Sequence, residues 1–440
     1  MNEKTELPAT SRRQFLKTSS AAAIGGAFAA QLAFPQRSSA ANSETLRIGL
    51  VGCGGRGTGA ADQALNADSN VVLTAMADVF EDQLQNSLTL LKNKLPEKVQ
   101  VVPERCFVGL DAYQKVINSG VDVVVLATPP GFRPLHFKAA VDAGRHIFCE
   151  KPMATDAPGI RQVMTSVAEA KRKNIAVVAG FCWRYNLARR EFFRKVHENA
   201  LGDIRAIHAT YYTTPVKPMP EASKRPANAT DLEWQLRNWY NFGWLCGDGL
   251  VEQAVHSIDK IAWAMKDVPP AKAVAVGGRQ IPSFGGNIFD HFEVNYEYKN
   301  GVRASMACRQ QSGCFSQTAD FIMGSKGIGL IGAQGGRGVP EISGENPWKF
   351  DGPDNDPNMY QVEHNELFAS IRAGKPLNDG DRMCSSTLMA LMGRMAAYTG
   401  QEITWQQALN SKERLVPENL DWNMTLPVAP LAMPGRTRFI

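Results

Sequence analysis

The sequence predicts an α/β protein that begins with a doubly wound parallel sheet and continues with an α+β domain on a large, mostly antiparallel open sheet. Two observations predict the first domain: apolar runs alternate with helix-compatible stretches, and a glycine-rich turn joins the first run to the first helix. In the second domain, strand-like runs flank Asn300-Gly301, a strong hairpin signal.

The chain divides into four predicted segments: an export signal over 1–41, the first domain over 45–180, the second over 181–411 and an extended, proline-punctuated tail over 412–440. The first domain has predicted strands at 46–51, 71–77, 121–127, 146–149 and 175–181, and helices at 58–65, 81–95, 133–143 and 157–173. In the second domain we expect strands at 271–276, 289–298, 302–309 and 320–323, closed by helices at 360–372 and 384–398.

The first forty residues are typical of a secretory signal rather than of a folded element. Arg12 and Arg13 precede an uncharged, Ala/Gly-rich stretch over 18–34, and small residues near position 40 offer a cleavage site. The arginine pair resembles the twin-arginine export motif, which implies transport of an already folded protein by the twin-arginine translocase. The stretch is too weakly apolar for a confident membrane span, which needs ~20 strongly apolar residues. We expect a periplasmic or otherwise exported protein, retained at the membrane if the signal is not cleaved.

Charge and cysteine content argue against two classes of partner. The formal net charge is +5, but +3 of it lies in the first forty residues, and no basic run of the nucleic-acid-binding kind occurs. The eight cysteines are scattered, without a Cys-x-x-Cys pair or a Cys/His grouping at zinc spacing. We therefore expect neither nucleic acid nor a metal. Cys308 and Cys314 could pair after export, which the sequence leaves open.

The glycine-rich turn reads Gly-Cys-Gly-Gly-Arg-Gly, the G-x-G-x-x-G spacing of a Rossmann dinucleotide site. Gly52 would permit the tight turn, Gly54 the approach of a pyrophosphate, and Gly57 the close packing of helix on strand. Gly55 and Arg56 lie at the start of the helix, whose N–H groups would face the phosphates.

Asp78 ends the second predicted strand, 21 residues after Gly57, where a carboxylate would accept hydrogen bonds from a ribose diol. Val79 and Phe80 follow and offer no cation for a 2′-phosphate. This favours NAD over NADP, although Arg56 or a distant arginine could still reach such a phosphate. Because an exported protein has no cofactor pool to draw on, we expect tight binding.

Two later motifs carry a family resemblance. Thr128-Pro129 follows the third predicted strand, and Glu150-Lys151-Pro152 follows the fourth. These residues closely resemble the glucose-fructose oxidoreductase/inositol dehydrogenase/MocA family, over about 46–411. The resemblance implies that Lys151 lies by the nicotinamide and the substrate hydroxyl, with Glu150 beside the cofactor. An ammonium fixed there favours a developing alkoxide and lowers the barrier to hydride departure.

The second domain contributes a helix pattern over 247–259. Glu252, His256 and Asp259 recur at i, i+4 and i+7, so they would share one face. The family's catalytic helix commonly has aspartate four residues before its histidine, which assigns the general base to His256 and puts Glu252 at the aspartate position. Glutamate reaches one methylene further, so its contact, to substrate or to His256, is left open. Asp259 could instead orient His256.

Two more segments are candidates for the ligand site. Arg184 follows the last predicted strand of the first domain, where the family often places an arginine near nicotinamide or substrate; an interdomain salt bridge is the alternative. Tyr240 belongs to a loop whose aromatic rings suit the apolar face of a sugar. The alternative role of these rings is a buried aromatic cluster or a contact between subunits. The other residues of that loop are Trp234, Arg237, Trp239 and Trp244.

Three functions fit these residues. The first is an NAD(P)-dependent oxidoreductase acting on a CH–OH group of a sugar, cyclitol or related polyol, with Lys151 polarising the hydroxyl and His256 moving its proton. The second is an NAD-dependent glycosidase or lyase that oxidises a ring carbon transiently and restores its own cofactor. The third is a non-catalytic sugar-binding relative. Because open sheets form subunit contacts in this family, we expect a homodimer or homotetramer. The sequence does not identify the substrate.

Overall fold

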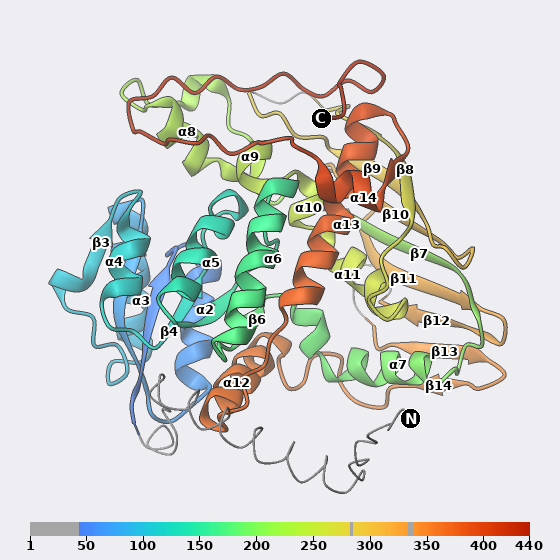
Figure 1. Cartoon of the computed structure of the whole chain (residues 1–440), viewed down its shortest axis with the longest axis horizontal. Coiled ribbons are helices and arrows are strands. Elements are labelled where there is room, and N and C mark those ends of the chain that lie inside the picture. Colours follow the sequence, from blue (N-terminus) through green and yellow to red (C-terminus); the bar gives the residue numbers. More distant parts are fainter. Residues whose placement is uncertain (1–43, 282–284, 333–337) are drawn as a thin grey trace, which may run out of the picture. The chain divides into compact units, whose positions relative to one another are not determined.

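The computed structural model describes residues 44–281, 285–332 and 338–440, and the predicted export signal lies outside these residues. Both predicted sheets form within the unit that runs from Thr45 to Ile440 (Figure 1). Among the helices of the described residues, none is long and apolar enough to cross a membrane.

The first sheet has six parallel strands in the order β3-β2-β1-β4-β5-β6, which confirms the predicted doubly wound arrangement. Its strands are β1 Leu46–Val51, β2 Val71–Asp78, β3 Cys106–Val108, β4 Val123–Leu126, β5 His146–Cys149 and β6 Val177–Ala179. The intervening helices are α2 Gly55–Asn66, α3 Glu81–Lys94, α4 Ala112–Asn118, α5 Arg133–Asp142 and α6 Ala157–Arg172.

Helices cover both faces of this sheet, which is why its strands are continuously apolar. α4, α5 and α6 pack on one face, and α2 and α3 on the other. A helix from much later in the chain, α12 (Met359–Arg372), completes the second layer. The sequence analysis assigned this helix to the second domain, but Leu367 and Phe368 pack in the same cluster as Phe148. Its apolar pattern shows which side of the helix is buried, but not which sheet that side meets.

The second sheet has nine strands in the order β14-β13-β12-β11-β7-β10-β9-β8-β15, and among these β7 and β10 form the parallel pair. The strands are β7 Ile204–Thr213, β8 Lys272–Gly278, β9 His291–Glu297, β10 Arg303–Gln310, β11 Gln317–Gly324, β12 Gly327–Ile331, β13 Glu341–Gly344, β14 Trp348–Lys349 and β15 Ile403–Thr404. Gly301, at φ +87°, turns the predicted hairpin between β9 and β10. The central strand, β7, was not among the predicted strands, because polar residues such as His208 interrupt its apolar pattern.

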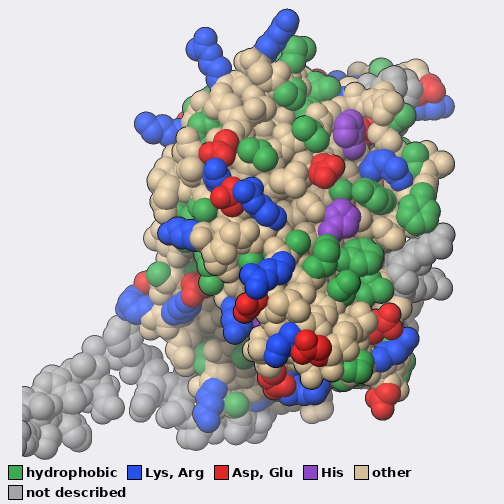
Figure 2. All heavy atoms as spheres, turned by 90° about the vertical axis from the view of Figure 1, so that its right-hand side faces the viewer, with side chains coloured by type: hydrophobic (Ala, Val, Ile, Leu, Met, Phe, Trp, Pro, Cys, Tyr) green, Lys and Arg blue, Asp and Glu red, His purple; other side chains and the backbone are tan. Residues whose placement is uncertain are grey.

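Helices bury one face of the second sheet and leave the other open. α7 (Leu187–His197), α11 (Val255–Ala264), α13 (Gly380–Thr399) and α14 (Trp405–Asn410) share an apolar cluster with its strands. Figure 2 looks onto the side of the molecule where this sheet lies, and hydrophobic and charged side chains are interspersed there. Val274 and Val276 of β8 are exposed. Assembly through such a face stays a prediction.

Between β7 and α11 lie three short α-helices: α8 (Asp231–Arg237), α9 (Gly243–Cys246) and α10 (Gly249–Glu252). After α14, residues 411–440 contain neither helix nor strand. Cys308 is buried and Cys314 is exposed, and both are free thiols in this structure.

Candidate active site

In the turn between β1 and α2, two glycines lie where any side chain would clash with neighbouring backbone. Gly52 has φ +94°, and a Cβ there would lie 2.7 Å from the backbone that follows β4. At Gly57 a Cβ would lie 1.8 Å from the Gly52 carbonyl oxygen. At Gly54 and Gly55, by contrast, a Cβ would meet nothing within 4 Å. This open space, faced by the N–H groups that start α2, forms a cradle that fits the pyrophosphate of a dinucleotide.

Asp78 ends β2 beside this turn. Its carboxylate accepts hydrogen bonds from the Cys53 N–H at 2.7 Å and the Phe80 N–H at 2.9 Å, which fix its orientation. Burial raises the pKa of Asp78, and these hydrogen bonds act in the opposite direction. Each carboxylate oxygen has two lone pairs, so the group keeps the capacity to accept from a ribose.

Arg56 links the turn to Glu150 and to a residue that the sequence analysis missed. Its Nε donates to Glu150 Oε1, and its NH2 lies 3.5 Å from Glu363 Oε1 on α12. Burial, followed by the charge of Glu150, raises the pKa of Glu363 well above its usual value, and the charge of Arg56 acts in the opposite direction. A Cβ at Gly180 would lie 2.6 Å from Glu150 Oε2. Glu150 Oε2 also accepts from the Lys151 N–H at 3.3 Å, so Glu150 is held from two sides. A contact of Arg56 with the cofactor stays a prediction.

Thr128 and Pro129 follow β4, and a buried arginine ties this loop to the one after β5. Arg133 donates to the carbonyl oxygens of Leu126 and Thr128 at 2.8 Å, and its Nε donates to that of Pro152 at 3.2 Å. A single guanidinium therefore ties together the loop that carries Thr128 and the loop that carries Lys151. The sequence analysis did not single out Arg133, because a helical arginine carries no local sign of such a role.

Lys151 joins the two halves of the site. Its Nζ lies 2.8 Å from Glu252 Oε1 and also donates to the Glu252 carbonyl oxygen. The two side chains are 10% and 5% exposed, so the ion pair is largely withdrawn from water. Because an ammonium has three N–H donors, one remains for a ligand oxygen. The carboxylate of Glu252 thus contacts Lys151, which was not among the contacts that the sequence left open.

The other carboxylate oxygen of Glu252, Oε2, is connected by hydrogen bonds to Gln253 and Tyr211, which were not among the predicted site residues. Gln253 Nε2 donates to Glu252 Oε2 at 2.6 Å, and the Tyr211 hydroxyl donates to Gln253 Oε1 at 3.1 Å. Burial, then the charge of Glu252, raises the pKa of Tyr211 and that of Tyr240. Both phenols therefore stay protonated at neutral pH and can donate hydrogen bonds next to Glu252.

The helix predicted over 247–259 is broken, which is a correction. α10 ends at Glu252 and α11 begins at Val255. Between them, the Ala254 N–H donates to the Gly249 carbonyl, five residues back, and the His256 N–H to the Gln253 carbonyl, three residues back. The i to i−4 pattern is lost here, so Glu252 and His256 belong to different helical segments. A periodic sequence pattern does not reveal such an interruption.

His256, in the first turn of α11, has a neutral ring. Burial lowers the pKa of His256 well below 6.5, and the positive charges of Lys151, Lys260 and Arg56 lower it further. Its Nδ1 is buried and has no hydrogen-bond partner among the described residues. A neutral imidazole near Lys151 can accept a proton from a hydroxyl.

Asp248 holds the start of α10 in a strained conformation. It has φ +92° and ψ 163°, a region that is essentially reserved for glycine. Its side chain is fully buried and accepts hydrogen bonds from the Gly249 N–H, the Tyr398 hydroxyl and the Phe289 N–H, the last at 2.8 Å. Burial raises the pKa of Asp248 to about 6. This carboxyl thus positions the segment that carries Glu252.

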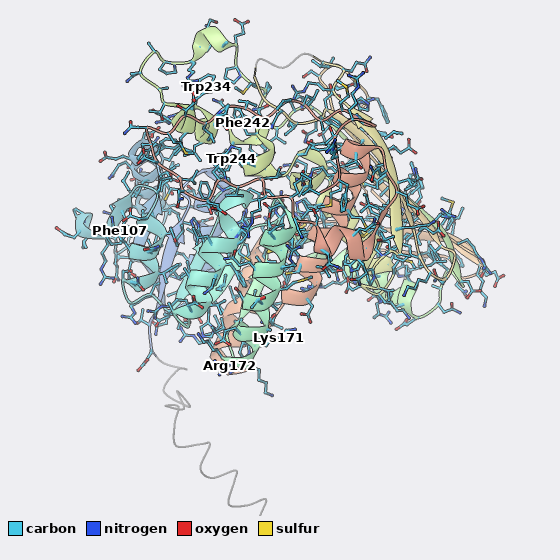
Figure 3. All side chains as sticks on the ribbon, turned by 45° about the horizontal axis from the view of Figure 1, so that its top comes forward. Phe107, Lys171, Arg172, Trp234, Phe242 and Trp244 are labelled. Atoms are coloured by element: carbon cyan, nitrogen blue, oxygen red, sulfur yellow. The ribbon has the colours of Figure 1, made fainter. Side chains whose placement is uncertain are left out.

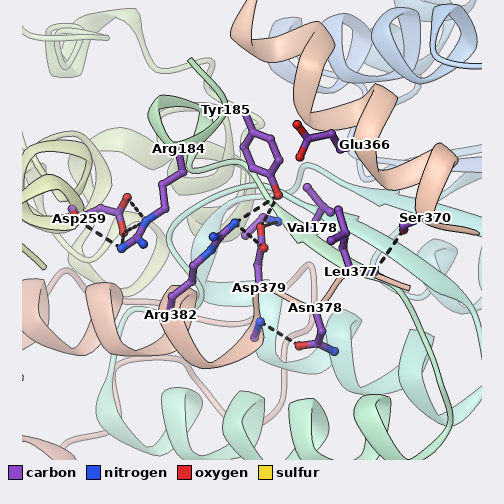
Figure 4. A network of polar contacts seen from close by, with 12 residues as sticks. Val178, Arg184, Tyr185, Asp259, Glu366, Ser370, Leu377, Asn378, Asp379 and Arg382 are labelled. Carbon is purple, nitrogen blue, oxygen red and sulfur yellow. Dashed lines mark hydrogen bonds and ion pairs between the residues drawn. The ribbon is translucent and has the colours of Figure 1, made fainter. Parts of the chain in front are cut away.

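Arg184 lies in a buried ion network (Figure 4). Its Nε and NH2 donate to the Asp259 carboxylate at 2.9 Å, and its NH1 donates to Asp267 at 3.1 Å. Ser386 donates to the same carboxylate of Asp259 at 2.7 Å. The structure thus shows Arg184 in a buried salt bridge with two residues of the same predicted domain, and pairs Asp259 with Arg184 rather than with His256. A contact of Arg184 with nicotinamide or substrate stays a prediction.

The aromatic loop packs into a cluster above the carboxyl ends of the first sheet's strands (Figure 3). Trp244 is 8% exposed, and its Nε1 donates to Gln235 Oε1 at 2.7 Å. Its ring meets that of Phe132 edge-on at 6.0 Å. Trp244 is therefore part of a buried aromatic cluster, which was the alternative to a sugar contact for this loop. Tyr240, stacked on Trp239 at 3.8 Å, stays a substrate candidate.

Comparison with models of protein families identifies the family to which this chain belongs. Residues 46–181 match the model described as "Oxidoreductase family, NAD-binding Rossmann fold", and 190–328 match the "GFO/IDH/MocA C-terminal domain". The two matches together cover more than half of the chain. The chain belongs to the Gfo/Idh/MocA family. Its first domain is an NAD-binding Rossmann domain.

Two curated relatives of this Gfo/Idh/MocA protein illustrate the level of similarity. An inositol 2-dehydrogenase from Acidiphilium cryptum is 25% identical over 259 residues, 59% of this chain and 66% of the relative. A glycosyl hydrolase family 109 protein from Streptomyces coelicolor is 26% identical over 168 residues, 38% of this chain and 34% of the relative. The chain thus spans less than two thirds of the length of these curated relatives.

The fold is that of solved members. The WlbA dehydrogenase from Bordetella pertussis, in complex with NADH and UDP-GlcNAcA, superposes with a TM-score of 0.63 at 19% identity, over 82% of this chain and 99% of that chain. At such identity the likeness shows the fold alone.

Proposed function

We propose that this chain is an NAD-dependent oxidoreductase that moves hydride between the cofactor and the CH–OH group of a sugar, cyclitol or related polyol. The observation that carries the proposal is the buried Lys151–Glu252 ion pair next to a neutral His256, beyond the strand ends of the NAD-binding sheet. The similarity to an inositol 2-dehydrogenase supports the substrate class.

The described residues fit a dinucleotide along the edge of the first sheet. The open cradle at Gly54 and Gly55 would hold the pyrophosphate and Asp78 the ribose, while Thr128, Pro129 and Glu150 would border the nicotinamide half. When bound, NAD supplies the acceptor or donor of the hydride. Arg237 is an arginine that lies near Asp78 in space, because its guanidinium stacks over the ring of Phe80. It is already paired with Asp82 and Glu233, which would have to give it up for a 2′-phosphate, so the pairing favours NAD over NADP.

The chain's own residues handle the proton and the charge. The remaining N–H of Lys151 Nζ would donate to the reacting oxygen and stabilise its developing negative charge. His256 would accept the hydroxyl proton, and Glu252 would hold the ammonium in place. Tyr240 would donate to a neighbouring hydroxyl of the substrate, because its phenol stays protonated.

The main proposal is tested on the purified protein by identifying co-purifying small molecules by mass spectrometry and then offering a panel of polyols. We expect bound NAD and formation of reduced nicotinamide with at least one member of the panel. A protein that contains and binds no dinucleotide would contradict the proposal, and one that binds NAD and sugar without any turnover would be a non-catalytic sugar-binding relative.

A second candidate is a glycosidase or lyase whose oxidation and reduction steps cancel within each cycle. It is favoured by the similarity to a glycosyl hydrolase family 109 protein. The two candidates differ in consumption: a dehydrogenase uses supplied NAD in stoichiometric amounts, whereas the recycling enzyme forms product without net use of NAD.

We further propose that the protein is exported by the twin-arginine translocase with its cofactor already bound, and that it assembles as a homodimer or homotetramer through the open sheet face. Export is tested by changing Arg12 and Arg13 to lysine and comparing cell fractions. Accumulation in the cytoplasm supports export by this route, and an unchanged distribution contradicts it. Light scattering of the purified protein tests assembly, and a monomer would contradict it.

A further inference from the structure

The segment after α14, residues 411–440, forms a loop whose two ends meet. The Ser411 hydroxyl donates to the Ile440 carbonyl oxygen at 2.6 Å, and the Lys412 N–H donates to the same oxygen at 3.0 Å. Between these ends the segment runs across the top of Figure 1 to α8 and back. We call it the C-terminal loop.

Hydrogen bonds tie the outgoing half of the C-terminal loop to both domains. The Leu415 N–H donates at 2.9 Å to Asp156, the N-cap residue of α6 in the Rossmann domain. The Leu426 N–H donates to Asp231 Oδ2 on α8 at 3.1 Å, and the Leu426 carbonyl accepts from Gln235 Nε2 at 2.7 Å. The tip between these two attachments is therefore held in one place.

The tip carries Trp422, which packs against the residues that follow Asp78. The ring centroids of Trp422 and Phe80 are 6.1 Å apart. The guanidinium of Arg237 lies 3.9 Å from the centroid of the Phe80 ring and is itself paired with Asp82 at 3.3 Å. Val79 and Leu110, which follow β2 and β3, pack into the same apolar cluster as Trp422.

These contacts lie at the adenosine end of the dinucleotide site. In a doubly wound sheet the ligand lies beyond the carboxyl ends of the strands, and the acidic residue ending β2 marks the adenosine ribose. We infer that the C-terminal loop is a clasp that covers this end of the site and slows release of NAD, with Trp422 as its main contact. The inference rests on the proposed function, since it requires that the chain bind NAD. It would give an exported enzyme a means to retain a cofactor that its surroundings do not replace.

The test is the rate at which preloaded NADH leaves the full-length protein, followed by its fluorescence after dilution into excess NAD. We expect Trp422→Ala to release NADH about tenfold faster or more, a factor that corresponds to about 1.4 kcal/mol. Asp231→Asn, which weakens the Leu426 attachment while leaving Trp422 in the chain, should also speed release. Val428→Ala, at an exposed loop position, is the matched control and should release NADH at the wild-type rate.

The outcomes separate the clasp from the proposed function. If the wild type binds NADH but Trp422→Ala and Asp231→Asn both release it at the wild-type rate, the clasp is wrong and the proposed function is untouched. If the wild type binds no dinucleotide at all, the proposed function fails and the clasp with it. Should Trp422→Ala not fold, the faster or unchanged release from Asp231→Asn decides.

Discussion

The cofactor side and the substrate side of this site are built in different ways. On the cofactor side a short stretch of backbone sets the geometry, because Gly52 and Gly57 lie where a Cβ would clash with neighbouring backbone. On the substrate side, side chains from separate elements meet: Lys151 after β5, Glu252 in α10 and Tyr211 in β7. The comparison shows why a local motif is readable from sequence, whereas a set of side-chain partners depends on the whole fold.

The largest expected effect comes from substitutions in the glycine-rich turn on the cofactor side. Gly57→Ala should abolish NAD binding and lower stability, since its Cβ would overlap the Gly52 carbonyl oxygen and overpacking typically costs about 1–3 kcal/mol. Gly54→Ala should lose NAD binding but keep its stability, because its Cβ enters the space expected for the pyrophosphate. NADH titration and urea unfolding measure the two effects. Wild-type NAD affinity in Gly57→Ala would contradict this account of the turn.

On the substrate side, His256→Gln should slow turnover by roughly 10²–10⁴-fold, the usual contribution of a positioned acid or base. His291→Gln, a histidine on β9 of the second sheet, is the control. Because the pKa of His256 is lowered, the wild-type rate should not decline as the pH falls through about 6.5, where an ordinary histidine titrates. A decline centred there that disappears in His256→Gln would show that the ring is not held neutral.

Lys151→Met should lower kcat by roughly 10²–10³-fold, as loss of one donor to a developing oxyanion does elsewhere. Lys171→Met is the matched control, because that lysine is exposed and pairs with an exposed aspartate on the surface. Steady-state kinetics separates the effects: a change in KM alone would mean that Lys151 binds the substrate without assisting the chemical step.

The smallest expected effect concerns Asp248, which holds the start of α10, and the pH dependence of stability that it causes. The pKa of Asp248 is raised to about 6 in the folded state, against about 4 in an unfolded chain. Between these values the unfolded chain has lost the proton and the folded protein keeps it, so stability falls as the pH rises, by up to about 3 kcal/mol. Asp248→Asn should flatten this part of the profile in unfolding measurements between about pH 4 and pH 6. An unchanged slope would mean that Asp248 is not the group responsible.

The sequence predicted most of the first domain, because glycine spacing and apolar strands are local signals. It also offered Lys151, Glu252 and His256 as candidates, through the family resemblance together with their chemistry, and their catalytic roles stay predictions. It did not predict that Glu363 lies beside Arg56, since α12 reaches the Rossmann sheet from far along the chain.

Two further features depend in the same way on partners from far along the chain. The break between Glu252 and Val255 depends on how Asp248 is held by Phe289 and Tyr398, which come from other elements. The burial of Arg184 depends on Asp259 and Asp267, which approach it only in the folded protein. Sequence periodicity contains no information about such partners.

The central claim is that this site moves hydride between a polyol carbon and NAD. The most direct test is to incubate the NAD-loaded protein with polyols that carry deuterium on carbon, and to look for the label on the nicotinamide by mass spectrometry. We predict deuterium on the nicotinamide of wild-type protein that is quenched during turnover, before a recycling cycle could return it to the sugar, and a strongly reduced rate in Lys151→Met. NAD that stays bound and unlabelled with every sugar, cyclitol and polyol offered would contradict the account.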